Sequence, residues 1–337
     1  MTSRAAAIDA FLAAEGWGAA ARRPLAGDAS ARRYARLERN GAPAILMDVP
    51  PASGLTVAPF LAVTAWLRGL GLSAPAILAA DPPEGLVLLE DLGEDVFLRL
   101  AADPAREAGL YAAAIDLVAD LQSAPPPAPA AHWSPLPYDR AVLMREMRLA
   151  PEWYLPAATG APASPDLAAE FDALVEPIVA IALDGPQLPV YRDYHAENLI
   201  WLPRRAGHAR VGLLDYQDLL IGHPAYDVVS LLEDARRDTS PELRAAMQAR
   251  YLARTGAEPG AFARAAHALA AQRNLKILGL FVRLARRDGK PGYLRHLPRV
   301  WAHLQRDLAH PDLAPLAAFV ARRLPPPEAA LAAGAAS

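Results

Sequence analysis

The most informative segment of the sequence reads Val190-Tyr-Arg-Asp193-Tyr-His195-Ala-Glu-Asn198-Leu-Ile-Trp201. Two further segments follow it, Val211-Gly-Leu-Leu-Asp215-Tyr-Gln-Asp218 and Gly222-His-Pro-Ala-Tyr-Asp227. Asp193 and Asn198 stand five residues apart. Asp215 follows a short apolar run, and Asp227 opens an apolar helical stretch. Short apolar pieces around sharp turns are typical of strands and loops, so these oxygen-bearing side chains are expected on turns.

The offsets of these side chains suit a site that holds magnesium and a polyphosphate. Mg²⁺ prefers hard oxygen ligands, usually one or two carboxylates together with phosphate oxygens. Asp215 and Asn198 are the predicted ligands, and Asp193, on a polar turn, is placed to orient an attacking hydroxyl. Asp227 is predicted to brace the loop, because a buried carboxylate accepts backbone N–H bonds.

Other interpretations of the same residues remain open. Asp and Asn on turns commonly cap helices or close turns, and each of these residues taken alone fits that role. A hydrolytic metal site of His195, Glu197 and an aspartate is the sharper alternative, although no His-x-x-x-His pair supports it. The combined pattern is much harder to obtain by chance than any single residue.

Composition restricts the class of protein. The chain has 337 residues, of which 53% are hydrophobic, so it is long enough for one large domain or two lobes. A net charge of −3 argues against a general binder of nucleic acid or anionic membranes. The absence of cysteine excludes disulfides and thiolate metal sites. Neither a signal peptide nor a membrane-spanning stretch is visible, so we expect a cytoplasmic protein, and no protein partner is indicated.

Periodicity along the chain predicts an α+β protein with a small antiparallel sheet followed by a mostly helical region. Apolar residues within 1–18 and within Val57–Leu70 have helical spacing, and strand-like segments flank the turn at Asn40-Gly41. The expected division is a lobe of residues 1–92, a helical lobe of residues 93–324 and a disordered tail of residues 325–337. The helices expected in the second lobe cover residues 104–121, 139–149, 165–183, 261–287 and 292–308.

The motif set resembles the aminoglycoside phosphotransferase and choline kinase-like superfamily, from about Ala26 to Leu308. Asp193-Tyr-His-Ala-Glu-Asn198 and Gly222-His-Pro-Ala-Tyr-Asp227 carry the likeness, together with a hinge-like Leu88-Leu-Glu-Asp-Leu-Gly93. The resemblance implies a bilobal protein kinase-like fold and the use of ATP and Mg²⁺. It also implies that Asp193 is the catalytic base, that Asn198 and Asp215 hold the metal, and that the backbone of Glu90, Asp91 and Leu92 binds adenine.

A narrower likeness points to one bacterial branch. Gly27-Asp-Ala-Ser-Ala-Arg-Arg-Tyr34 and Gln272-Arg-Asn-Leu-Lys-Ile-Leu-Gly279 resemble anomeric kinases of N-acetylmuramate and N-acetylglucosamine that serve peptidoglycan recycling. This resemblance implies transfer of phosphate from ATP to the C1 hydroxyl of the amino sugar, giving the α-1-phosphate that leads to a UDP sugar. The alternatives are a kinase of the same fold acting on an aminoglycoside, choline, homoserine or another sugar, and a pseudokinase that only binds.

The chain departs from its relatives in the predicted phosphate contacts. Kinase-like folds pair a strand lysine with a helix glutamate, yet no lysine precedes Lys276 and Val57–Leu70 has no acidic residue. We therefore expect Arg32 or Arg33 to supply the positive charge, since guanidinium binds phosphate bidentately. Ser30, in a loop with one glycine, is a weaker candidate for the phosphate.

The predicted sugar contacts come from two places. Tyr191-Arg192 replaces the usual His-Gly before the catalytic Asp, and Glu197 replaces a common Gly, so Arg192 and Glu197 are expected either to touch the sugar or to brace the loop. His195, Tyr226 and Asn274 complete the candidate set. His195 and Asn274 also have structural interpretations, as a hydrogen-bonded loop residue and as a contact between helices.

Overall fold

A computed structural model describes residues 3–25, 31–130 and 132–328. The chain separates into two compact units. Unit 1 comprises Met1–Ala113, Pro127–Pro135 and Glu197–Leu219, and unit 2 comprises Ala114–Pro126, Leu136–Ala196 and Leu220–Ser337. This division is not a single cut in the chain, because a hairpin from the middle of the sequence belongs to unit 1.

Unit 1 is built on a five-stranded antiparallel sheet with the strand order β1-β2-β3-β5-β4. The turn Asn40-Gly41 joins β2 to β3 with both residues at positive φ, which the type of turn between twisted strands requires. The expected hairpin is therefore confirmed. The strands are β1 (Ala21–Pro24), β2 (Arg33–Arg39), β3 (Ala42–Asp48), β4 (Ile77–Asp81) and β5 (Leu86–Glu90).

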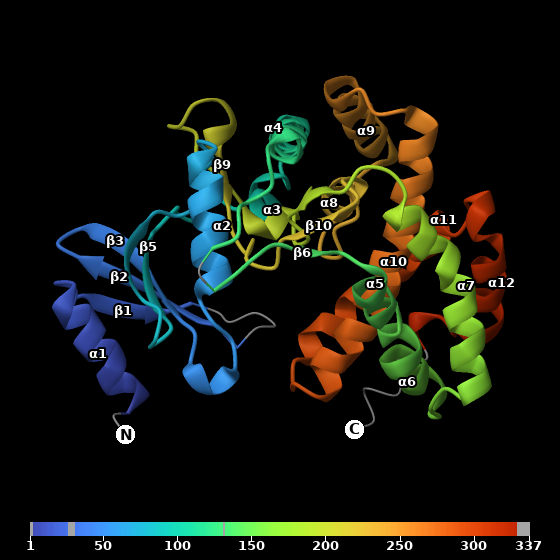
Figure 1. The fold of residues 1–337 in the computed structure, drawn as a ribbon, viewed down its shortest axis with the longest axis horizontal. Coiled ribbons are helices and arrows are strands. Elements are labelled where there is room, and N and C mark those ends of the chain that lie inside the picture. The colour runs from blue at the N-terminus through green and yellow to red at the C-terminus, as the bar shows by residue number, and fades with distance from the viewer. Residues whose placement is uncertain (1–2, 26–30, 131, 329–337) are drawn as a thin grey trace. The chain divides into compact units, whose positions relative to one another are not determined.

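Helix α1 (Arg4–Ala14) covers one face of this sheet (Figure 1). Phe11 and Leu12 of the helix, with Trp17 after it, form a core with alternate residues of the strands, which include Leu37 and Leu46. Side chains alternate between the faces of a strand. Ala35 and Leu37 therefore define the α1 face of β2, and residues of the other parity face away from α1.

The rest of unit 1 consists of helices and one later hairpin. Its helices are α2 (Ala58–Gly69), α3 (Phe97–Leu100) and the first half of α4 (Pro104–Ser123). The hairpin β8 (Leu199–Trp201) and β9 (Val211–Leu213) forms bridges from Ile200 to Val96 and from Gly212 to Ser73. These bridges explain why Glu197–Leu219 groups with the first part of the chain. Short 3₁₀ turns cover Pro51–Ser53, Ala196–Asn198 and Gly207–Arg210.

Unit 2 is mostly helical around α10 (Pro259–Arg286), which packs against α5, α7, α8 and α11. Gly279 lets the backbone that follows α5 approach α10 closely, because a Cβ at position 279 would lie 2.0 Å from the Leu149 carbonyl oxygen. The other helices are α5 (Arg140–Met147), α6 (Leu155–Thr159), α7 (Pro165–Leu183), α8 (Ala225–Leu232), α9 (Pro241–Thr255), α11 (Leu297–Asp307) and α12 (Ala314–Arg323). A π-helical segment (Ala150–Tyr154) and 3₁₀ turns (Pro291–His296, Pro311–Leu313) link them.

A small sheet in unit 2 carries the loop that holds Asp193. Strand β10 (Leu220–Gly222) pairs with β7 (Leu188–Val190) and with β6 (Leu136–Pro137). The predicted helices and strands are thus confirmed, and so is the α+β fold class. Among the described residues, no helix is long and apolar enough to cross a membrane. The predicted disordered tail falls largely on residues 329–337, outside the described part, whereas Pro325 accepts a hydrogen bond from Tyr154.

Candidate active site

The Asp193 loop follows β7 and is held by a buried carboxylate. Asp227, fully buried in α8, accepts hydrogen bonds from the backbone N–H groups of Tyr191 (2.8 Å) and Arg192 (2.9 Å). Burial raises the pKa of Asp227 to about 7, although the two backbone hydrogen bonds act in the opposite direction. The buried Gln122 donates to the Pro224 carbonyl at the start of the same helix. This is the geometry of a loop brace.

Two of the predicted site residues adopt left-handed backbone conformations. Arg192 has φ 75° and Asp215 has φ 61°, and Asn40 in the hairpin turn is the only other non-glycine residue at positive φ in the described ranges. Such conformations are sparsely populated for residues with a side chain, and they concentrate at functional sites. Arg192, which directly precedes Asp193, therefore takes a φ that is typical of glycine.

The β8–β9 hairpin brings Asn198 and Asp215 to one end of a two-stranded ribbon. Asn198 directly precedes β8, and its carbonyl oxygen accepts from the Leu214 N–H (3.0 Å). Asp215 follows one residue later, partly exposed, and accepts from the Gln217 amide (2.6 Å). One carboxylate and one carboxamide oxygen form a donor set that suits Mg²⁺ shared with phosphate oxygens. The residues present therefore fit the expected metal.

Helix α2 holds the Asp215 turn through an aromatic stack rather than through charge. The ring of Tyr216 stacks on Phe60 with centroids 5.2 Å apart. Its hydroxyl lies 2.6 Å from the Thr64 hydroxyl, which itself donates to the Phe60 carbonyl (2.6 Å). The single proton of Thr64 is thus committed, so Tyr216 donates to Thr64. The printed contacts between α2 and this turn are thus aromatic and hydroxyl contacts.

Arg32 and Arg33 have different surroundings, although they are neighbours in the sequence. Arg32 is mostly buried, and its Nη1 lies 3.9 Å from the Asp215 carboxylate. Arg33 is exposed and shares its parity with Ala35 and Leu37 on the α1 face of β2. Of the two candidates, only Arg32 is placed beside a predicted site residue. Ser30 and its loop lie outside the described residues.

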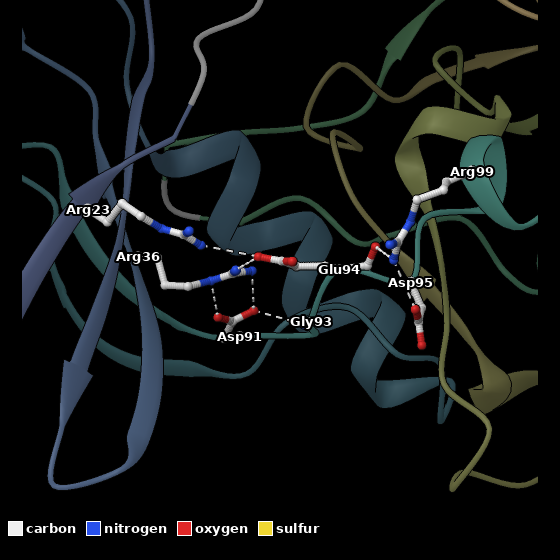
Figure 2. Close-up of polar contacts among 7 residues, drawn as sticks. All are labelled: Arg23, Arg36, Asp91, Gly93, Glu94, Asp95 and Arg99. Carbon is white, nitrogen blue, oxygen red and sulfur yellow. Dashed lines mark hydrogen bonds and ion pairs between the residues drawn. The ribbon is translucent and has the colours of Figure 1, made fainter.

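The side chains of the hinge-like segment are occupied by arginines of the sheet (Figure 2). Arg36 of β2 binds Asp91 (Nε–Oδ2, 2.6 Å) and Glu94, and Arg23 of β1 reaches Glu94 at 3.2 Å. Asp91 also accepts from the Gly93 N–H (2.8 Å). With its carboxylate engaged in this way, Asp91 is left to interact with a ligand through its backbone.

The side chain of Glu90 is engaged as well. It binds Arg205, in the loop between β8 and β9, and it accepts from the Ala76 N–H (3.1 Å). Arg205 also donates to Ser73 (2.7 Å). The Glu90 N–H itself donates to the Ala76 carbonyl (2.9 Å). The hinge and the metal-site hairpin are therefore joined by a charged contact inside unit 1. Leu92, next along the hinge, is almost fully buried.

His195 and Glu197 differ in exposure. His195 is 6% exposed, and burial lowers its pKa to about 4, so its ring is neutral near pH 7. Glu197 is exposed. No group of three His, Asp or Glu side chains that could hold a metal occurs among residues 3–25, 31–130 and 132–328. The hydrolytic alternative thus lacks a ligand set in the described part of the chain.

A buried cluster beside the Asp193 loop was missed by sequence reasoning. Glu146 of α5 forms ion pairs with Arg192 and with Lys276 of α10 (3.1 Å), and it accepts from Tyr138 and Gln272 (2.9 Å). Burial acts to raise the pKa of Glu146, but the charges of Lys276 and Arg192 reverse this and lower the pKa to about 2. The signal in the sequence was the polar run Gln272-Arg-Asn-Leu-Lys276 among the apolar residues of α10.

The two remaining predicted sugar contacts are buried. Tyr226 is 1% exposed and packs edge-on against Tyr138, which belongs to the Glu146 cluster. Asn274 is fully buried and donates to Glu233 and to Asp307, both at 3.1 Å. Asn274 therefore joins α10 to α11 and to the end of α8.

Comparison with known proteins gives one consistent result. A family model described as "Phosphotransferase enzyme family" matches residues 21–267. A protein of Caulobacter vibrioides named N-acetylmuramate/N-acetylglucosamine kinase is 41% identical, covering 96% of this chain and 98% of its own. One of the same name from Pseudomonas aeruginosa is 35% identical and covers 91% of each chain.

The solved structures agree in fold. The ADP-bound aminoglycoside phosphotransferase APH(2'')-Ib superposes with a TM-score of 0.61 at 14% identity, covering 89% of this chain and 97% of its own. The α+β architecture is accordingly that of the protein kinase-like phosphotransferases. From the sequence match over most of its length, together with the Asp193, Asn198 and Asp215 motif, the chain belongs to the phosphotransferase enzyme family.

Proposed function

We propose that this phosphotransferase is an ATP-dependent kinase that phosphorylates the anomeric C1 hydroxyl of N-acetylmuramate, N-acetylglucosamine or both. The observation that carries the proposal is the 41% identity, over nearly the whole of both chains, to a protein named as a kinase of these sugars. The α-1-phosphate product suits peptidoglycan recycling toward UDP sugars. ATP as the phosphate donor is in keeping with a cytoplasmic location.

In the proposed reaction the C1 oxygen attacks the γ-phosphorus of ATP, and the bond from that phosphorus to the leaving oxygen of ADP breaks. Asp193 accepts the proton of the hydroxyl and orients it, as a carboxylate on a rigid loop can do. Asp227 supports this role by fixing the backbone of Tyr191 and Arg192. Asn198 and Asp215 would hold Mg²⁺, which supplies charge neutralisation on the phosphates.

The phosphate contact missing from the first part of the chain is assigned to Arg32. Its guanidinium lies near Asp215, where the phosphate oxygens bound to the metal would come, and it is shielded from bulk water. In such surroundings a guanidinium binds phosphate more strongly than at an open surface. Adenine is assigned to backbone groups of Glu90 to Leu92, because the Glu90 and Asp91 side chains are engaged elsewhere.

The substrate assignment can be tested with purified protein, ATP and Mg²⁺ on N-acetylmuramate, N-acetylglucosamine, choline and kanamycin. We expect turnover of the amino sugars and a phosphorus NMR signal of an α-1-phosphate. Asp193→Asn serves as the control, with a loss of about 10³-fold or more in kcat expected for removal of the base. A C6 phosphate would refute the anomeric assignment, and turnover of choline or kanamycin alone would move the protein to another substrate class.

The Arg32 assignment has a matched control in its neighbour. Arg32→Ala is expected to lower kcat/KM for ATP by about 10- to 100-fold, the size of one charge-assisted contact to phosphate. Arg33→Ala, an exposed position on the α1 face, is expected to stay within about two-fold of the wild type. Equal effects of the two substitutions would contradict the assignment.

A further inference from the structure

The buried Glu146 cluster carries more positive charge than its own carboxylate balances. Two cations, Arg192 and Lys276, are paired with Glu146, and the side chains of all three are less than a fifth exposed. Tyr138 and Gln272 add only neutral hydrogen bonds. Removing charges from water is costly unless they are compensated, so two buried cations that share one carboxylate favour the approach of a further anion.

The cluster lies beside the loop that bears Asp193. Arg192 directly precedes Asp193 in the chain. Burial acts to lower the pKa of both Arg192 and Lys276, Glu146 raises it, and the Asp193 carboxylate adds a smaller contribution in the same direction as Glu146. A substrate whose hydroxyl reaches Asp193 therefore places its neighbouring substituents within range of these cations. Because little water surrounds them, an anion there would interact strongly.

Arg192 and Lys276 differ in the interactions that they already make. The backbone N–H of Arg192 donates to Asp227, its guanidinium binds Glu146, and it stands over the Tyr138 ring at 5.5 Å. Arg192 is thus built into the loop. Lys276 has three donors on its ammonium, and Glu146 is the ion-pair partner that the described residues give it. A lysine ammonium also reorients easily toward an incoming group.

We propose that Lys276 is the residue that recognises the carboxylate of an acidic amino sugar, and so sets the preference for N-acetylmuramate over N-acetylglucosamine. The two sugars differ by the lactyl carboxylate of N-acetylmuramate, an anion that a buried ammonium can bind. Glu146 holds Lys276 charged and in place, and Arg192 keeps Glu146 ionised. The inference rests on the proposed function, because it concerns how that same site distinguishes its substrates.

The test compares two sugars and a neutral analogue, N-acetylmuramate with its carboxylate converted to an amide. For the wild type we expect kcat/KM to be about 10- to 100-fold higher for N-acetylmuramate than for its amide, the size of one charge-assisted contact. In Lys276→Met this ratio is expected to fall to near one. Lys276→Arg is expected to restore part of it. Lys290→Met, which alters the chain's other lysine, is expected to keep the wild-type ratio.

The possible outcomes distinguish a failure of this inference from a failure of the proposed function. Equal losses on all three substrates in Lys276→Met would place Lys276 on the phosphate or on Asp193 and overturn the inference. An unchanged ratio would leave Lys276 as a structural partner of Glu146 and would also overturn it. If the wild type phosphorylates none of these sugars, the proposed function itself fails, whatever the lysine does.

Discussion

The two loops that carry the predicted catalytic groups are held by opposite means. The Asp193 loop of unit 2 is fixed by buried carboxyl groups: Asp227 on its backbone and Glu146 on Arg192. The Asp215 turn of unit 1 is fixed by the stack of Tyr216 on Phe60 and by one bond between hydroxyls. Both positions include a residue at positive φ, Arg192 or Asp215, so each loop needs support.

Because the two loops are held differently, they are expected to tolerate different substitutions. Removing one member of a buried charged network leaves its partners in a poor environment, which costs several kcal/mol and depends on pH. Removing a neutral hydroxyl contact costs about 1 kcal/mol and is insensitive to pH below the titration of tyrosine. Substitutions that affect the Asp193 loop should therefore change the free energy of unfolding most. Substitutions that affect the Asp215 turn should change it little and should alter activity by small factors.

Asp227→Ala is expected to produce the largest loss. It removes the acceptor of two buried backbone N–H groups, each bond to a carboxylate being worth about 1.5–3 kcal/mol, so we expect a loss of about 3–5 kcal/mol. Denaturant unfolding measures it. Asp227→Asn keeps one acceptor oxygen and should retain roughly half of this stability. If Asp227→Ala unfolds at the wild-type denaturant concentration, the charged brace does not support the loop.

Glu146→Gln should cost somewhat less and should show a defined pH dependence. The pKa of Glu146 is about 2 in the folded protein, against an ordinary value of 4.5 for a glutamate side chain. At about 1.4 kcal/mol per pKa unit, this difference corresponds to about 3 kcal/mol. Because the folded-state pKa is lowered, the contribution is present above pH 4.5 and is lost as the pH falls toward 2. The stability gap between wild type and Glu146→Gln should narrow over that range.

The matched control for Glu146 is Glu176→Gln, which breaks an ion pair between exposed side chains and should change stability little at any pH. Thermal unfolding of the three proteins at several pH values between 2 and 7 makes the comparison. A gap between wild type and Glu146→Gln that stays constant across this range would show that the buried cluster does not bind protons as described.

Sequence reasoning predicted the parts of the site that are local in the chain. The offsets of Asp193, Asn198 and Asp215 are short, and the turn at Asn40-Gly41 has its own signature, so both follow from neighbouring residues. The faces of strands are also local. They separate Arg32 from Arg33, but only once β2 is known to begin at Arg33 and its core face is known.

Contacts between distant segments could not be predicted in this way. Lys276 and Glu146 come from two helices and stand 130 positions apart. No sequence pattern around either residue predicts the other as its partner. Asn274 illustrates the same limit, because its buried amide could serve a ligand or a neighbouring helix until α11 placed Asp307 beside it. Tertiary packing decides which polar residue of an apolar helix faces the substrate.

Arg36→Met tests the hinge of unit 1, which contains an ion pair that is less buried than the Glu146 cluster and less exposed than a surface pair. Asp91 is only 6% exposed in its side chain and would lose the bidentate Arg36, for an expected cost of about 2 kcal/mol and a several-fold rise in the KM for ATP. Arg23→Met is the control, because the Arg23–Glu94 pair is more than 60% exposed on both sides and is worth at most about 1 kcal/mol. Equal effects on the KM for ATP would show that the hinge is not ordered by Arg36.

The hydroxyl pair of Thr64 and Tyr216 gives the smallest expected effect. The direction of its hydrogen bond also predicts which of the two substitutions costs more stability. Because Thr64 donates to the Phe60 carbonyl, Tyr216→Phe removes only a donor and should cost about 0.5–1 kcal/mol. Thr64→Val removes the acceptor of the buried Tyr216 hydroxyl and should cost about 1–2 kcal/mol. The double variant should resemble Tyr216→Phe, giving a coupling of about 1 kcal/mol in a double-mutant cycle. Additive losses, or a larger loss for Tyr216→Phe, would mean that the hydroxyl pair does not fix the Asp215 turn, and the contrast between the two loops would rest on the aromatic stack alone.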